Sequence, residues 1–169
     1  MSGEQKESEP VMNEQTLDVL YDVYDKRYAL EAQRKDTIEN KASMLIGFSG
    51  FIAGLITGLI AGISTTELLF NIFFGGSIIF FTATGVVSLY VIRLKKYTYP
   101  SKPKSFKEID ELYKLKPIEI KDEIIKNTVF CITMNSVLND KKAKQLMIAY
   151  YCATLGIVFI LVAAIIYFF

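Results

Sequence analysis

Residues 42–66 read ASMLIGFSGFIAGLITGLIAGISTT and contain no charged side chain. Two later stretches share this character: residues 68–92, LLFNIFFGGSIIFFTATGVVSLYVI, and residues 145–169, QLMIAYYCATLGIVFILVAAIIYFF. A helix rises about 1.5 Å per residue, so 25 residues exceed the roughly 30 Å of hydrocarbon in a bilayer. The three runs therefore predict three transmembrane helices.

The composition of the whole chain also supports a membrane protein over a soluble one. Hydrophobic residues make up 51% of the 169 residues, and the mean hydropathy is +0.31. Outside the three runs, too little apolar sequence remains to bury them in a soluble core. A cleaved signal peptide is also disfavoured, because the first run follows a long polar segment and exceeds the length of a signal core.

The positions of lysine and arginine predict the orientation of the spans. Basic residues precede the first span, follow the second and precede the third, whereas residues 64–67 between the first two spans contain none. Basic loops stay on the cytosolic side. We therefore expect a multi-pass inner-membrane protein with a cytosolic N-terminus and an external C-terminus.

The chain divides into segments by polarity, and the polar ones are expected to be helical. We predict an all-α integral membrane protein whose three transmembrane helices carry long cytosolic helical extensions, packed as a bundle. Nothing between Asn13 and Gly62 forces a helix break, while Ser105 and Glu108 form a capping box for a short helix. A long helix begins near Ile118, and the sequence leaves open whether it bends or continues to the end. The predicted segments are a disordered leader (1–12), a cytosolic helix (13–41), the first span with its outer turn (42–66), the second span (67–92), a cytosolic linker with helices (93–144) and the third span (145–169).

Glycines at intervals of four are the most specific pattern in the sequence. Gly50, Gly54, Gly58 and Gly62 lie on one side of the first span, which consequently has almost no side-chain volume. In lipid, such faces permit close approach of another helix backbone. Two interpretations remain: tight packing against the second or third span of the same chain, or self-association of first-span helices around a pore.

The residues needed for common catalytic chemistry are missing. The chain has no histidine, and no nucleotide-binding loop or nucleophile motif appears. We expect neither an enzyme nor a bound cofactor or metal. The spans carry no charge for an ion relay, and a net charge of +1 gives no case for nucleic-acid binding.

Polar residues also interrupt the apolar stripes of the helices flanking the membrane. One interpretation is a juxtamembrane network that passes a cytosolic signal to the spans. The other is a set of ordinary intrahelical pairs and helix caps. The candidates are Arg27, Glu31, Arg34, Lys41, Asn135 and Asn139.

The stretch from Arg27 to Gly47, RYALEAQRKDTIENKASMLIG, resembles the entrance to the first span of prokaryotic SLATT and Pycsar-type transmembrane effectors. Those proteins carry an I-D/E-x-K-A step before a glycine-containing span, filled here by Ile38, Glu39, Lys41 and Ala42. The spacing of Asn135, Asn139 and Lys142 before the third span is similar as well. This sequence departs from its relatives in having three spans, where two or four are common, and in lacking a recognisable sensor domain.

The resemblance implies an effector of antiphage defence that oligomerises and damages the inner membrane when triggered. Its expected partners are the lipid bilayer, further copies of the chain, and a nucleotide signal or a cytosolic protein. The alternative is a structural or adaptor protein, whose cytosolic helices dock a partner and whose spans only anchor it.

Overall fold

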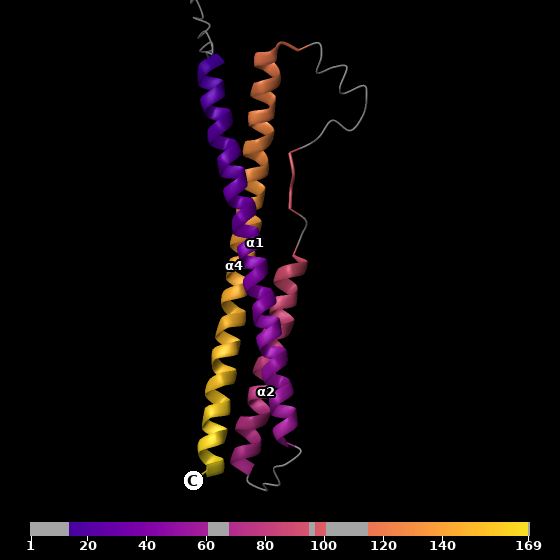
Figure 1. Cartoon of the computed structure of the whole chain (residues 1–169), viewed down its shortest axis with the longest axis vertical. Helices are drawn as coiled ribbons and strands as arrows, with labels where there is room; N and C mark the ends of the chain where they lie inside the picture. The colour runs from indigo at the N-terminus through magenta and orange to yellow at the C-terminus, as the bar shows by residue number, and fades with distance from the viewer. Residues whose placement is uncertain (1–13, 61–67, 95–96, 101–114, 169) are drawn as a thin grey trace, which may run out of the picture. The chain divides into compact units, whose positions relative to one another are not determined.

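The computed structural model describes residues 14–60, 68–94, 97–100 and 115–168. The predicted leader, Gly62, the outer turn at 64–67 and the short helix from Ser105 lie outside these residues. Within the described part, regular structure is entirely helical and consists of α1 (Glu14–Ile60), α2 (Leu68–Arg93) and α4 (Pro117–Phe168) (Figure 1).

All three described helices are long and apolar enough to cross a membrane. Only 22%, 22% and 17% of their most apolar windows is buried inside the protein, so most of this apolar surface is exposed. Exposed apolar surface of this extent is unfavourable in water and favourable in lipid. The prediction of an all-α membrane protein with three spanning helices is confirmed.

The helices do not break between their polar and apolar parts. α1 comprises 47 residues and α4 comprises 52, each an uninterrupted helix. The question that the sequence left open for the last helix is thereby answered, since α4 continues through Asn139 and Asp140. Neither of these two polar residues interrupts the helix.

The chain forms two compact units, each of which contains part of α1 and part of α4. The first comprises Met1–Leu30 and Thr98–Met134, and the second comprises Glu31–Tyr97 and Asn135–Phe169. In the first unit, Leu17 and Ile125 are buried, and Lys121 donates to Asp18. That hydrogen bond is the main cause of a raised pKa at Lys121.

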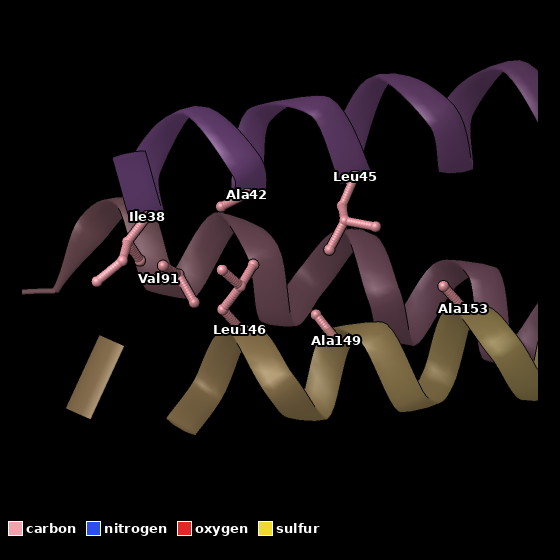
Figure 2. Packing of buried hydrophobic residues seen from close by; sticks show 7 residues of the cluster. All are labelled: Ile38, Ala42, Leu45, Val91, Leu146, Ala149 and Ala153. Carbon is pink, nitrogen blue, oxygen red and sulfur yellow. The ribbon is translucent and has the colours of Figure 1, made fainter. Parts of the chain in front are cut away.

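The second unit packs α1, α2 and α4 around one apolar cluster (Figure 2). Its members come from all three helices and include three alanines, which permit close helix packing. Along α2, buried positions recur at intervals of three, four or seven residues, the spacing of helices packed along their length. The cluster consists of Ile38, Ala42, Leu45, Val91, Leu146, Ala149 and Ala153.

Among the described glycines of this unit, the two with the least space for a side chain lie where α2 contacts α4. A Cβ atom added at Gly76 would lie 2.6 Å from the Phe159 ring, and one at Gly156 would lie 3.1 Å from the Phe81 ring. The absent side chains therefore make room for large aromatic rings. These two glycines, and not Gly50, Gly54 or Gly58 of the first span, are used in packing within the described part of the chain.

Candidate functional site

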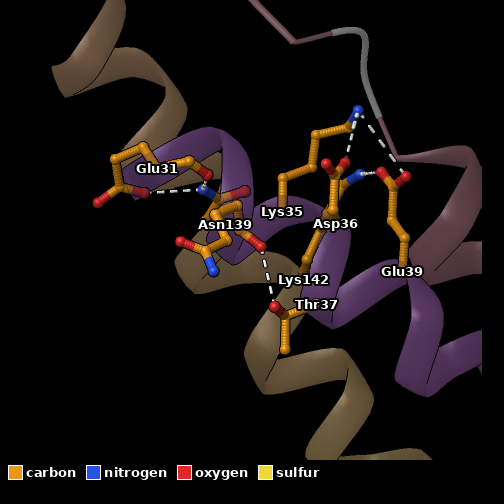
Figure 3. Close-up of polar contacts among 8 residues, drawn as sticks. Glu31, Lys35, Asp36, Thr37, Glu39, Asn139 and Lys142 are labelled. Carbon is orange, nitrogen blue, oxygen red and sulfur yellow. Dashed lines mark hydrogen bonds and ion pairs between the residues drawn. The ribbon is translucent and has the colours of Figure 1, made fainter. Parts of the chain in front are cut away.

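A layer of polar side chains lies next to the apolar cluster in the second unit, where α1 meets α4. The layer is built from both helices and is drawn in Figure 3. Along α4, buried positions recur every seven residues at Asn135, Lys142, Ala149, Gly156 and Ala163. The last three are small, whereas the first two are polar and almost completely buried. The packed face of α4 thus changes from apolar to polar at Lys142.

Lys142 is the most unusual residue of the layer, because its side chain carries a charge and is only 2% exposed. Its Nζ donates to Oε1 of Glu39, and the two form an ion pair between α4 and α1. The other carboxylate oxygen of Glu39 lies 3.9 Å from Lys35 Nζ. Lys35 Nζ in turn lies 5.6 Å from the centre of the Tyr97 ring, a cation–π contact with the segment that follows α2.

Asn139 forms the second link between the helices of the layer. Its side-chain Nδ2 donates to the backbone oxygen of Glu31 at 3.0 Å and to Glu31 Oε2 at 2.7 Å. Its Oδ1 is buried and has no hydrogen-bond partner among the described residues. The layer is therefore polar but incompletely satisfied, a combination that weakens a buried network.

Arg34 and Asp140 form the exposed edge of the layer. Arg34 Nη2 donates to Asp140 Oδ1 at 2.7 Å, and Arg34 Nη1 lies 3.8 Å from Glu31. The side chains of Arg34 and Asp140 are 43% and 56% exposed. Exposed pairs of this kind contribute about 0–1 kcal/mol, whereas removing one partner from a buried pair costs about 3–5 kcal/mol. Glu39 is 26% exposed, but its loss would leave the buried Lys142 ammonium unpaired, so the Glu39–Lys142 pair is the energetically important contact.

The structure brings four of the six predicted network residues into this layer. Glu31, Arg34 and Asn139 are joined by the contacts above, and Asn135 is fully buried on the same face of α4. Arg27 and Lys41 are exposed and make no ion pair with another described residue. Arg27 belongs to the first unit.

Sequence reasoning omitted Glu39 and Lys142 from the candidate site. Both occur in the motifs quoted above, but the basic residues before the third span include Lys141, Lys142 and Lys144, and charge alone does not distinguish Lys142 from the other two. The repeat of seven from Asn135 to Ala163 was the signal that distinguishes it. A lysine in that repeat faces the helix partner, whereas its neighbours Lys141 and Lys144 are exposed.

The predicted glycine face of α1 is open in the described structure. Gly50, Gly54 and Gly58 are exposed, and no atom of another element would contact a Cβ added at any of them. Gly54 follows Leu45 by nine residues, and about 100° per residue places it roughly opposite that core position. The face is therefore not used for packing within the chain, which removes the first of the two interpretations for these three glycines.

One known protein family matches the chain over most of its length. The model of the Pycsar effector protein domain matches residues 32–169. The chain belongs to this family. The match covers the polar layer except Glu31, together with all three apolar runs, and it identifies a membrane-associated effector of antiphage defence. Searches of curated proteins and of solved structures found no match.

Proposed function

We propose that the chain is an oligomeric effector of the bacterial inner membrane that forms a pore or otherwise disrupts the bilayer. The family match supports the membrane effector class. The observation that carries the oligomeric step is the open glycine face of α1, opposite the packed core of the same helix. In lipid, a face without side chains is the kind of surface through which helices associate closely.

In this proposal the N-terminus and residues 93–144 lie in the cytosol, and the C-terminus lies outside. Lys41, Arg93, Lys141 and Lys144 are exposed near the cytosolic ends of the apolar runs, as the positive-inside rule requires. A nucleotide signal or a cytosolic protein would act on the cytosolic helices. The chain acts without catalysis, cofactor or metal.

The test compares the first-span glycines with glycines elsewhere. Replacing Gly54 and Gly58 by leucine adds bulk to the open face without a clash inside the chain, so we expect loss of oligomers and of depolarisation after induced expression. Gly75 and Gly85 of α2 are half-buried, but a Cβ added at either would also meet no neighbour within 4 Å, and their double leucine variant is the control. Membrane potential, dye entry and cross-linked oligomer size are the measurements. Wild-type depolarisation and oligomer size in the Gly54→Leu, Gly58→Leu variant would contradict the proposal.

A second candidate function is that of an adaptor, favoured by exposed apolar side chains in the first unit. Val19, Val23 and Leu30 on α1 are exposed, as are Phe130 and Met134 on α4. An adaptor would use them to dock a cytosolic partner. Under that function, the full-length Phe130→Ser, Met134→Ser variant would lose the partner, and expression of the wild type would leave the membrane potential unchanged.

A further inference from the structure

We propose that the ion pair between the partly exposed Glu39 and the buried Lys142 is a releasable latch that holds α4 against α1 in the resting effector. This inference rests on the proposed function, because it specifies how the membrane activity is restrained. It assigns the restraint to one contact and predicts opposite effects for charged and apolar substitutions there.

The latch has one cation and one anion, each from a different helix. Among the described residues, Glu39 is the only acidic side chain within ion-pair distance of Lys142. Lys142 lies one helical turn before Leu146 and seven residues before Ala149, both members of the apolar cluster. A charge next to such a cluster is stable only while its partner is in place.

An ion pair at this position is weaker than the contact that could replace it. A buried pair must overcome the desolvation of both charges, and apolar residues of similar volume often hold such a site as well or better. The unpartnered Oδ1 of Asn139, within the same layer, further reduces the stability of the closed arrangement. Polar residues at these positions therefore favour a contact that can open.

The latch is also connected to the third helix of the unit. Glu39 is close to Lys35, whose ammonium lies over the Tyr97 ring beyond the end of α2. A change at Glu39 therefore alters contacts that reach α1, α4 and the segment after α2. One ion pair is thereby connected to α1, to α4 and to the segment that follows α2.

The first arm of the test asks whether the ion pair forms in the full chain in detergent. The measurement is the midpoint of thermal unfolding. Glu39→Lys and Lys142→Glu each place like charges together, and we expect both to lower the unfolding midpoint. The exchanged double variant Glu39→Lys, Lys142→Glu should recover most of the loss, and Glu39→Leu, Lys142→Met should match or exceed the wild type. Failure of the exchange to restore stability would overturn the latch.

The second arm measures release of carboxyfluorescein from vesicles of phosphatidylethanolamine and phosphatidylglycerol carrying equal amounts of each variant. We expect Glu39→Lys to release dye more than about tenfold faster than the wild type, since loss of a buried pair exceeds the 1.4 kcal/mol that corresponds to a tenfold population shift. The exchanged variant should return to the wild-type rate, and the apolar variant should fall below it. Asp140→Lys, which breaks the exposed pair in the same layer, is the matched control and should change little.

The outcomes separate the latch from the proposed function. Leakage that depends on Gly54 and Gly58 but is unchanged by Glu39→Lys would overturn the latch and leave the function in place. Leakage from the apolar variant at or above the wild-type rate would also overturn the latch. No leakage from any variant, the wild type included, would overturn the function and with it the latch as a restraint.

Discussion

Neighbouring lysines at the start of the third run differ in their surroundings. Lys141 and Lys144 are exposed, whereas Lys142 is buried and paired with Glu39. Successive residues of a helix point about 100° apart, so adjacent lysines reach different surroundings. One residue type therefore occurs within four positions in two surroundings, at the surface and in the contact between helices.

The thiol of Cys131 is free and buried in the first unit, and its reactivity can be predicted. Burial raises the pKa of the Cys131 thiol, because the charged thiolate is desolvated there. In a Cys152→Ser background we expect iodoacetamide to react with Cys131 more slowly at pH 8 than with the same thiol in unfolded chain. The control is the rate in denaturing detergent, and equal rates would contradict the prediction.

The sign of the accompanying effect on stability follows from the direction of this shift. A folded-state pKa above the unfolded value means that the folded state binds the proton more tightly. The stability gained is therefore fully present below the ordinary thiol pKa of about 8.5 and is lost as the pH rises through the folded pKa. We expect the unfolding midpoint to fall less with alkaline pH in Cys131→Ala than in the wild type.

At the scale of helices, glycines with similar sequence contexts have different roles. Gly76 and Gly156 leave space for the rings of Phe159 and Phe81 at the contact between α2 and α4. Gly50 and Gly54 of α1 face open space. In α1 the spacing of four marks a surface left free, whereas Gly76 and Gly156, which belong to no such repeat, lie at contacts within the chain.

This difference predicts opposite outcomes for the same substitution. Gly76→Ala should destabilise the full chain in detergent by about 1–3 kcal/mol, because its Cβ would clash with the Phe159 ring. Gly50→Ala should be neutral or slightly stabilising, by at most about 1 kcal/mol, because alanine favours helix and meets no neighbour. Unfolding midpoints of the two variants are the measurement, and equal effects would show that the packing assigned to α2 and α4 is wrong.

At the scale of the whole molecule, the proposed topology follows from three spans and the position of the basic residues. An odd number of crossings puts the two termini on opposite sides of the membrane. We expect fusions of alkaline phosphatase at the C-terminus to be active, and fusions at the N-terminus or within residues 101–114 to be inactive. A green fluorescent protein fused at the same positions should give the reverse pattern. Active phosphatase at both termini would contradict the topology.

Local patterns in the sequence are enough to establish the helical membrane class and the family resemblance. Runs of 25 uncharged residues have one favourable environment, the bilayer, and in lipid the backbone must satisfy its own hydrogen bonds. The polar residues on the first and last helices can also be recognised in the sequence, because they interrupt apolar stripes. Each of these conclusions depends on local composition or on spacing along one helix.

The contacts between residues far apart in the sequence are known only from the folded chain. Glu39 and Lys142 are separated by 103 positions. The repeat of seven places Lys142 on the packed face of α4, but nothing along the sequence identifies Glu39 of α1 as its partner. The same limit applies to the glycines, because a face without side chains fits a neighbour in the same chain as well as one in another copy. Partner choice depends on how helices align in space, and that alignment is set by packing across the whole unit.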